Sequence, residues 1–342
     1  MLRRGSDIDP IPFPVLMADI GGTNARFAIL QETHSPLREF ATVQTRDYPD
    51  IMTAVSETVL DTTAILPRSL LIAIAAPLHS GATKLTNADW VIEPEALLET
   101  LNLDTLITFN DFEALSLSLP SLGPDQVVSL GGGAGDTRSP RVVLGPGTGL
   151  GVAALIYADG RYQPIAGEGG HMSFGPASER DEALWPHLER LHGRVTGETL
   201  LSGNGLARIY RALAAEAGRD GSACSTGAEV TDAAGRGDTL GAEAIDLFLT
   251  YLGRIAGDLA LLFLARGGVY IAGGIAPRLA DKFAGSRFRE AFEDKAPHRA
   301  IVEDIPTYLV TEPKPAVAGL SSFAQLPGRF CVNLGQRRLD RS

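Results

Sequence analysis

Two residue types are scarce in this sequence, and each scarcity excludes a class of protein. Cysteine occurs at two of the 342 positions, Cys224 and Cys331, which are far apart and in no metal-ligand spacing. Neither a disulfide framework nor a zinc site is indicated, and a reducing compartment such as the cytoplasm fits. Lysine occurs four times and never in a glycine-rich loop: Lys84, Lys282, Lys295 and Lys314.

Two common nucleotide-binding motifs are also missing. The chain contains neither Gly-Lys-Ser/Thr nor G-x-G-x-x-G, which excludes a P-loop and a dinucleotide-binding fingerprint. A phosphate bound in a lysine-free loop would have its charge met by backbone N–H groups and a divalent cation.

Nothing in the sequence predicts export, a membrane span or nucleic-acid binding. The longest apolar stretches, near residues 69–78 and 255–271, are short or interrupted by charges and glycines. Residues 1–14 carry arginines, aspartates and prolines where a signal peptide has an apolar segment. The net charge of −11 repels nucleic acid.

Apolar patterns predict strands and helices that alternate along the chain. Length alone favours two domains, and a hairpin followed by alternating strands and helices indicates α/β domains with a mixed sheet. The tail beyond Pro327, rich in arginine, is predicted to be solvated and disordered. We expect strands at 15–20, 25–30, 37–43, 70–75, 106–109, 142–144, 150–157 and 269–272, and helices at 50–60, 95–101, 112–119, 179–192 (split by Pro186), 196–215, 240–266 and 316–325.

A carboxylate stands where the strand at 106–109 passes into the helix at 112–119. Asp111 follows Asn110 at that junction, and rigid elements on both sides would fix its side chain at the end of the strand. This is a suitable position for a catalytic base. The alternative is that Asp111 is only the N-cap of the helix.

Two hairpins with glycine-rich turns are spaced 125 positions apart, counted from Thr23 to Thr148. In the first, residues 21–24 form the turn and Asp19 interrupts an apolar strand. Glycine N–H groups and the Thr and Asn side chains suit a phosphate, while Asp19 suits a metal-bound water. In the second, residues 145–149 form the turn. The repetition suggests two halves built alike, although an ordinary diglycine hairpin is the simpler alternative for the first.

Three further segments are candidate binding sites. Glu168 and His171 lie in a loop enclosed by glycines and could both reach one small ligand, or the loop is an ordinary solvent-exposed turn. Glu198 either stabilises the start of a helix or reaches the ligand. Gly273 and Gly274 would let an adenine and a ribose lie against the backbone, or they mark a close helix–strand crossing.

Taken together, these motifs resemble the bacterial ATP-dependent glucokinase family, of the hexokinase and actin type. The resemblance covers roughly residues 14–325 and keeps the order of the family's motifs. The cysteine-rich zinc motif of a related group is absent, which favours the zinc-free branch. The motifs are Asp19-Ile20-Gly21-Gly22-Thr23-Asn24, Asn110-Asp111-Phe112, Gly145-Pro146-Gly147-Thr148-Gly149-Leu150-Gly151, Gly167-Glu168-Gly169-Gly170-His171 and Ala272-Gly273-Gly274-Ile275.

The resemblance implies two ribonuclease-H-like α/β domains that flank a deep cleft. The smaller would comprise residues 14–120 with 316–342, and the larger 121–315. It also implies a cytoplasmic homodimer that uses ATP, Mg²⁺ and D-glucose. Asp111 would be the base, and the sugar hydroxyls would be held by Asn110, Asp111, Glu168, His171 and Glu198. The nucleotide would be bound by Ala18, Asp19, Ile20, Gly21, Gly22, Thr23, Asn24, Gly147, Thr148, Gly149, Gly273 and Gly274, with Asp19 holding the metal through water.

Three other functions fit parts of the pattern. The first is a kinase for another hexose or an N-acetylated hexose, since the sequence does not show the shape of the pocket. The second is a sugar-responsive regulator, which would need a DNA-binding helix-turn-helix ahead of Val15; the residues there are few, acidic and rich in proline. The third is an actin-like ATPase, which the loop with Glu168 and His171 disfavours.

Overall fold

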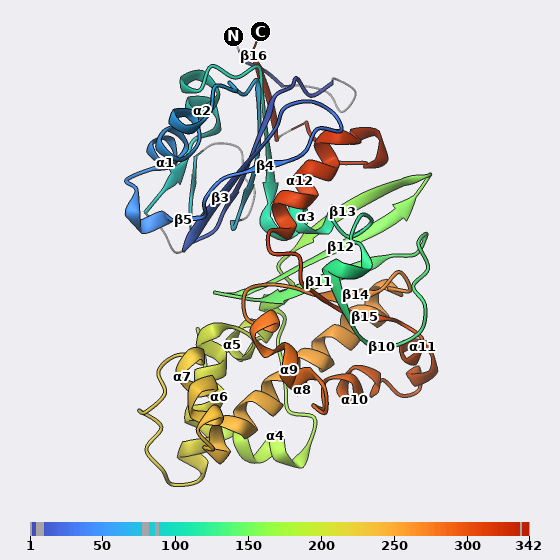
Figure 1. The fold of residues 1–342 in the computed structure, drawn as a ribbon. Helices are drawn as coiled ribbons and strands as arrows, with labels where there is room; N and C mark the ends of the chain where they lie inside the picture. The colour runs from blue at the N-terminus through green and yellow to red at the C-terminus, as the bar shows by residue number, and fades with distance from the viewer. Residues whose placement is uncertain (1, 5–9, 77–81, 86–88, 336, 342) are drawn as a thin grey trace. The chain divides into compact units, whose positions relative to one another are not determined.

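The chain folds into two compact units, each with its own sheet and helices (Figure 1). The computed structural model describes residues 2–4, 10–76, 82–85, 89–335 and 337–341. The first unit comprises residues 1–122, 155–166 and 312–342, and the second comprises residues 123–154 and 167–311. The expected smaller domain did not include the segment 155–166.

The sheet of the first unit is mixed, as the sequence predicts. Its central strands β2 (Val15–Ile20), β6 (Ser69–Ile74) and β9 (Thr105–Asn110) are parallel, and β3 (Asn24–Leu30) pairs antiparallel with β2. Every residue of β2 and β6 is buried, as expected for near-continuous apolar strands covered on both faces. The strand order is β1 (Leu2–Arg4), β16 (Arg338–Arg341), β9, β6, β2, β3 and β4 (Arg38–Glu39), with β5 (Val43–Gln44) also on β3 and a separate pair β7 (Thr83–Lys84) and β8 (Val91–Ile92).

The α-helices among the described residues of the first unit are α1 (Ile51–Thr58), α2 (Pro94–Thr100), α3 (Asp111–Ser116) and α12 (Pro315–Gln325). The N-cap of α1 is Asp50, which accepts the Thr53 N–H at 2.7 Å. Helix α12 lies on α3 and β9, where Phe323 meets Phe109 edge to face at 5.2 Å between ring centroids. Contact is closest at Gly319, because an added Cβ would lie 1.8 Å from the carbonyl oxygen of Ala114.

The C-terminal tail contains a paired strand, β16, so the prediction of a solvated, disordered tail is wrong for residues 338–341. Strand β16 pairs antiparallel with β9, and β1 pairs with β16. The Arg338 side chain is only 3% exposed and pairs with Asp340 at 3.0 Å. Arginine content alone suggested solvation, but Arg337 pairs with Glu113 and Arg338 with Asp340 within the unit.

The sheet of the second unit repeats the hairpin arrangement of the first. Strand β11 (Arg141–Pro146) is followed by the second glycine turn and by β12 (Leu150–Ala158). Strand β14 (Val269–Ile271) pairs parallel with both β11 and β15 (Thr307–Val310). The order is completed by β10 (Val127–Gly131) beside β15 and by β13 (Arg161–Gly167) beside β12. The end of β12 and most of β13 lie in the segment 155–166, which is grouped with the first unit.

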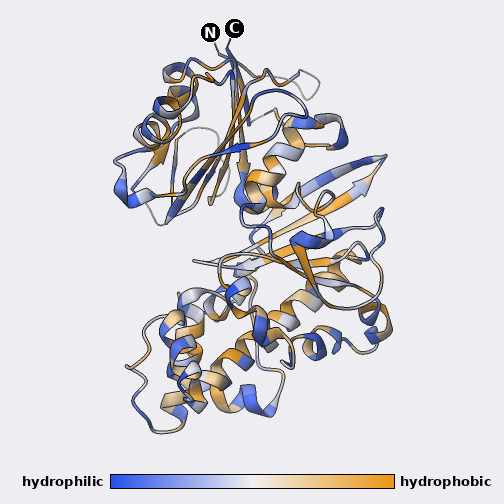
Figure 2. Ribbon diagram, in the orientation of Figure 1, coloured by the Kyte–Doolittle hydropathy of each residue, from blue (hydrophilic) through white to orange (hydrophobic). Residues whose placement is uncertain are grey.

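The helices of the second unit pack around the long helix α8 (Thr239–Phe263), whose apolar residues are visible in Figure 2. Helix α8 ends three residues earlier than predicted, because Leu264 takes a left-handed conformation with φ of 45°. The predicted helix at 196–215 is two helices, α5 (Gly197–Leu200) and α6 (Gly203–Glu216). Of the helix predicted at 179–192, α4 (Glu179–Leu184) ends just before Pro186, as expected, but residues 188–192 are not helical. The others are α7 (Gly227–Gly235), α9 (Ala280–Phe283), α10 (Phe288–Glu293) and α11 (Arg299–Glu303).

No helix in the described part of the chain is long and apolar enough to cross a membrane.

Candidate active site

The junction of β9 and α3 presents Asp111 as predicted, but Asp111 is not the N-cap. Asn110 is the N-cap, and its Oδ1 accepts the N–H groups of Phe112 and Glu113, each at 3.1 Å. The Glu113 side chain completes a capping box by accepting the Asn110 N–H at 3.4 Å. Asp111 is therefore the first helical residue, half-buried, with Oδ1 also 2.9 Å from the Phe112 nitrogen. The capping alternative is wrong for Asp111, since Asn110 performs that role.

The first glycine turn, residues 21–24, is held by backbone contacts. The Gly21 N–H donates to the Asn24 carbonyl at 2.9 Å. Thr45 supports the turn from outside, because its N–H donates to the Thr23 carbonyl and its hydroxyl to the Gly22 carbonyl, both at 3.0 Å. The Thr23 side chain is exposed. The turn is thus a fixed loop with polar groups at its surface.

Asp19 lies on β2, directly before this turn, and is 8% exposed. It pairs with Arg26, which faces it across the β2–β3 ladder at 2.9 Å. Burial raises the pKa of Asp19 and Arg26 opposes that rise. The arginine was not predicted, although the antiparallel register of a four-residue turn could have indicated it. Within the described residues, no three acidic, His or Cys side chains gather as a metal site.

The second glycine turn, residues 145–149, is bound to Glu198. The Leu150 N–H donates to Glu198 Oε2 at 2.9 Å. A Cβ at position 149 would lie 2.3 Å from the same oxygen, so glycine at 149 makes room for the carboxylate. Glu198 therefore does more than stabilise a helix start.

The turn at residues 167–171 packs against Leu150, the residue whose N–H donates to Glu198. Gly170 packs on Leu150, since an added Cβ would lie 2.2 Å from the Leu150 carbonyl oxygen. The side chains of Glu168 and His171 are exposed, with Glu168 Oε2 3.9 Å from His171 Nε2. Leu150 therefore contacts Glu198 through its N–H and the loop that carries Glu168 and His171 through Gly170. All three side chains are predicted sugar ligands.

A cavity of about 400 Å³ in the second unit lies beside the second glycine turn. Position 273 requires glycine for two reasons. Its φ is +83°, and an added Cβ would lie 2.5 Å from the Pro146 carbonyl oxygen. The Ile275 N–H donates to that same carbonyl at 3.2 Å, and the Gly203 N–H donates to the Gly147 carbonyl at 2.9 Å. None of its lining residues is among the predicted site residues, because they come from segments far apart in the sequence. The lining is Gly203, Asn204, Leu206, Thr226, Gly227, Ala228, Thr231, Asp232, Ile275, Arg278 and Leu279.

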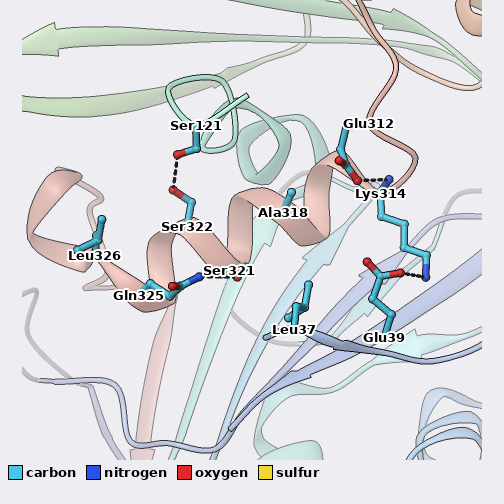
Figure 3. A pocket seen from close by; sticks show the side chains of 10 residues that line it. All are labelled: Leu37, Glu39, Ser121, Glu312, Lys314, Ala318, Ser321, Ser322, Gln325 and Leu326. Carbon is cyan, nitrogen blue, oxygen red and sulfur yellow. Dashed lines mark hydrogen bonds and ion pairs between the residues drawn. The ribbon is translucent and has the colours of Figure 1, made fainter. Parts of the chain in front are cut away.

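A second cavity, of about 360 Å³, lies in the first unit against α12 (Figure 3). Its polar walls are already paired: Lys314 contacts Glu39 at 2.8 Å, and the hydroxyls of Ser121 and Ser322 are 3.3 Å apart. It does not adjoin either glycine turn, since its lining comes from residues 37–39, 121 and 312–326. We therefore exclude it from the candidate active site.

Two α/β units, each with a glycine-turn hairpin, are the arrangement that the resemblance to kinases of the hexokinase and actin type leads us to expect. The match to the Glucokinase family model places the chain among the ATP-dependent hexose kinases. The sequence model of the Glucokinase family matches residues 16–327. The glucokinase of Chelativorans sp. (strain BNC1) is 45% identical over 329 residues, which is 96% of each chain. The chain belongs to the glucokinase family.

Solved structures agree with this assignment. The glucokinase of an Antarctic psychrotroph has a TM-score of 0.81 and 32% identity, covering 92% of this chain and 99% of that one. The fold is shared with a ROK family glucokinase from Streptomyces griseus in complex with glucose and AMPPNP, with a TM-score of 0.59, 19% identity, and coverage of 92% and 99%.

Proposed function

We propose that the protein transfers the γ-phosphoryl group of ATP to the 6-hydroxyl of D-glucose. Membership of the glucokinase family supports the reaction. The observation that carries the catalytic assignment is the β9–α3 junction, where Asn110 caps the helix and Asp111 is placed at its first residue. Phosphoryl transfer needs mainly positioning and charge stabilisation, and such a junction holds one carboxylate in a fixed place.

Asp111 is proposed as the general base. It would orient the 6-hydroxyl and accept its proton as the bond to phosphorus forms. Asn110, Glu168, His171 and Glu198 would bind the other hydroxyls, since carboxylates accept hydrogen bonds from neighbouring sugar hydroxyls.

The nucleotide would use both glycine turns. Residues 18–24 and 147–149 would meet the phosphates through N–H groups and hydroxyls, and the cavity beside Gly273 and Gly274 would take the adenosine. Mg²⁺ would neutralise phosphate charge. Since Asp19 is a single carboxylate already paired with Arg26, it fits a bound water of the ion better than direct ligation.

We also propose a cytoplasmic homodimer, on the strength of the family resemblance. A kinase for another hexose or an N-acetylated hexose is the competing function. A coupled assay across a panel of hexoses, with and without Mg²⁺, distinguishes the two: glucose should give the highest kcat/KM, and no turnover should occur without a divalent cation.

The base assignment is tested with Asp111→Ala. Glucose binding should persist in part, while kcat falls by at least about a hundredfold, the lower range for loss of a general base. Asp104→Asn is the matched control, because this residue precedes the other end of β9 and its ion pair with Arg68 is exposed. A near-normal kcat in Asp111→Ala would disprove the assignment.

A further inference from the structure

The C-terminal tail reaches the β9–α3 junction through one arginine. Arg337 Nη1 donates to both carboxylate oxygens of Glu113, at 2.5 and 2.6 Å. The backbone contributes as well, since the Thr108 N–H on β9 donates to the Arg337 carbonyl at 3.1 Å. The tail therefore holds both the strand that precedes Asp111 and the helix that begins with it.

Glu113 is 2% exposed, and a buried carboxylate is stable only with a counter-ion and further hydrogen bonds. Arg337 is the counter-ion. The remaining capacity of Glu113 goes to the Asn110 N–H, through the oxygen Oε2 that Arg337 also contacts. The Arg337 guanidinium thereby holds the Glu113 carboxylate in place, and that carboxylate accepts the Asn110 N–H.

Asn110 in turn fixes the residue beside it. Its side chain accepts the N–H groups of Phe112 and Glu113, so Asp111 lies between two residues that are hydrogen-bonded into the cap. We propose that Arg337 is a positioning residue for catalysis: through Glu113 and the Asn110 cap, it sets the orientation of the Asp111 carboxylate. This rests on the proposed function of Asp111.

The contribution comes from a part of the chain outside the family's sequence model, which ends at residue 327. Arg337 is 224 positions from Glu113. Arg337 therefore lies outside the segment on which the match to the family model rests.

The test is Arg337→Met, with Arg341→Met as the matched control. Arg341 lies on β16 in the same tail, but it contacts Asn102 and the Glu99 carbonyl, away from the cap. We expect Arg337→Met to lower kcat about ten- to a hundredfold, the range for a misplaced catalytic group, with a smaller change in the KM for glucose. Arg341→Met should keep kcat within about twofold, since its contacts are surface contacts.

The double variant Glu113→Gln/Arg337→Met distinguishes a positioning role of Arg337 from a merely structural one. The glutamine removes the unpaired buried charge but keeps an oxygen for the Asn110 N–H, so kcat should recover most of its loss. Glu113→Ala/Arg337→Met lacks that acceptor and should not recover. Equal kcat in the two double variants, or a wild-type kcat in folded Arg337→Met whatever its Tm, would overturn the inference.

Two measurements keep the test decisive. If Arg337→Met does not fold, Glu113→Gln and Glu113→Ala are compared with Arg337 in place, and a wild-type kcat in Glu113→Ala overturns the inference. Hydrogen exchange of the backbone amides of residues 110–116 can be measured without turnover. Exchange there should be faster in Arg337→Met and unchanged in Arg341→Met. Unchanged exchange in Arg337→Met would contradict the inference. A wild-type enzyme that does not phosphorylate glucose would refute the proposed function, and the exchange result would still test the hold of Arg337 on the cap.

Discussion

Substituting Gly149 by alanine should disconnect Glu198 from the second glycine turn. The added Cβ would lie 2.3 Å from Glu198 Oε2 and 3.0 Å from its Cδ. A side chain can rotate away where a backbone cannot, so the loop should keep its shape while the carboxylate moves. That movement breaks the 2.9 Å bond from the Leu150 N–H.

The cost follows from that bond. A hydrogen bond to a charged group contributes roughly 1.5–3 kcal/mol, and Glu198 is half-buried, so water replaces part of it. We expect Gly149→Ala to lose about 1–2 kcal/mol of stability, or roughly 2–8 °C in Tm for a unit of this size. Since Glu198 is also a proposed sugar ligand, the KM for glucose should rise at least about fivefold, the effect of about 1 kcal/mol.

The assay is thermal unfolding together with glucose kinetics, and the turn itself supplies the control. Gly147 has no heavy atom within 4 Å of an added Cβ, so Gly147→Ala should leave Tm unchanged. In a Glu198→Ala background, Gly149→Ala should cost almost nothing, because the atom it displaces is gone. If Gly149→Ala remains equally costly there, the explanation through Glu198 is refuted.

Two further predictions concern the first unit. Because burial raises the pKa of Asp19 above its ordinary 3.8, the folded state binds this proton more tightly than the unfolded state. Wild-type stability is then lost as pH rises through the raised pKa. The Tm of Asp19→Asn minus that of wild type should therefore increase as the pH rises above 3.8. Gly319→Ala places a Cβ 1.8 Å from the Ala114 carbonyl oxygen; it should force α12 from α3 and cost at least about 2 kcal/mol in urea unfolding.

The controls differ for the two. A pH-independent Tm difference for Asp19→Asn would show that burial does not raise its pKa. For Gly319→Ala, the control is Gly235→Ala at the end of α7, where an added Cβ meets nothing within 4 Å. That variant should be neutral or gain up to about 1 kcal/mol, and an equal loss in both variants would contradict the packing argument.

Local patterns predicted most of the fold because they depend on neighbours in the sequence. The buried runs of β2 and β6 and the stripe of α8 are set by which residues are apolar. Helix ends were less predictable. Leu264 ends α8 in a left-handed conformation without a glycine, and residues 201–202 divide one predicted helix into two.

The positions of the candidate site residues were predictable where they follow a local motif, and their distant partners were not. Asp111 could be found because a carboxylate at a strand end is visible in the sequence. Two contacts could not be predicted because their partners are distant in the sequence. The hydrogen bond from Leu150 to Glu198 spans 48 positions, and the ion pair of Arg337 with Glu113 spans 224. The arginine-bearing tail was assigned to solvent for the same reason: charge alone does not reveal a buried partner.

These distant partners explain why the end of the chain returns to the first unit. The β9–α3 junction is held by parallel β6 on one side, by α12 packed at Gly319, and by β16 with Arg337 on the other side of β9. Two of these three supports come after residue 312. A strand end alone would fix the backbone of Asp111 but leave the first turn of a six-residue helix free to fray. The C-terminal segment adds a packed helix and a buried counter-ion at that turn, and so supplies the rigidity that a positioned base requires.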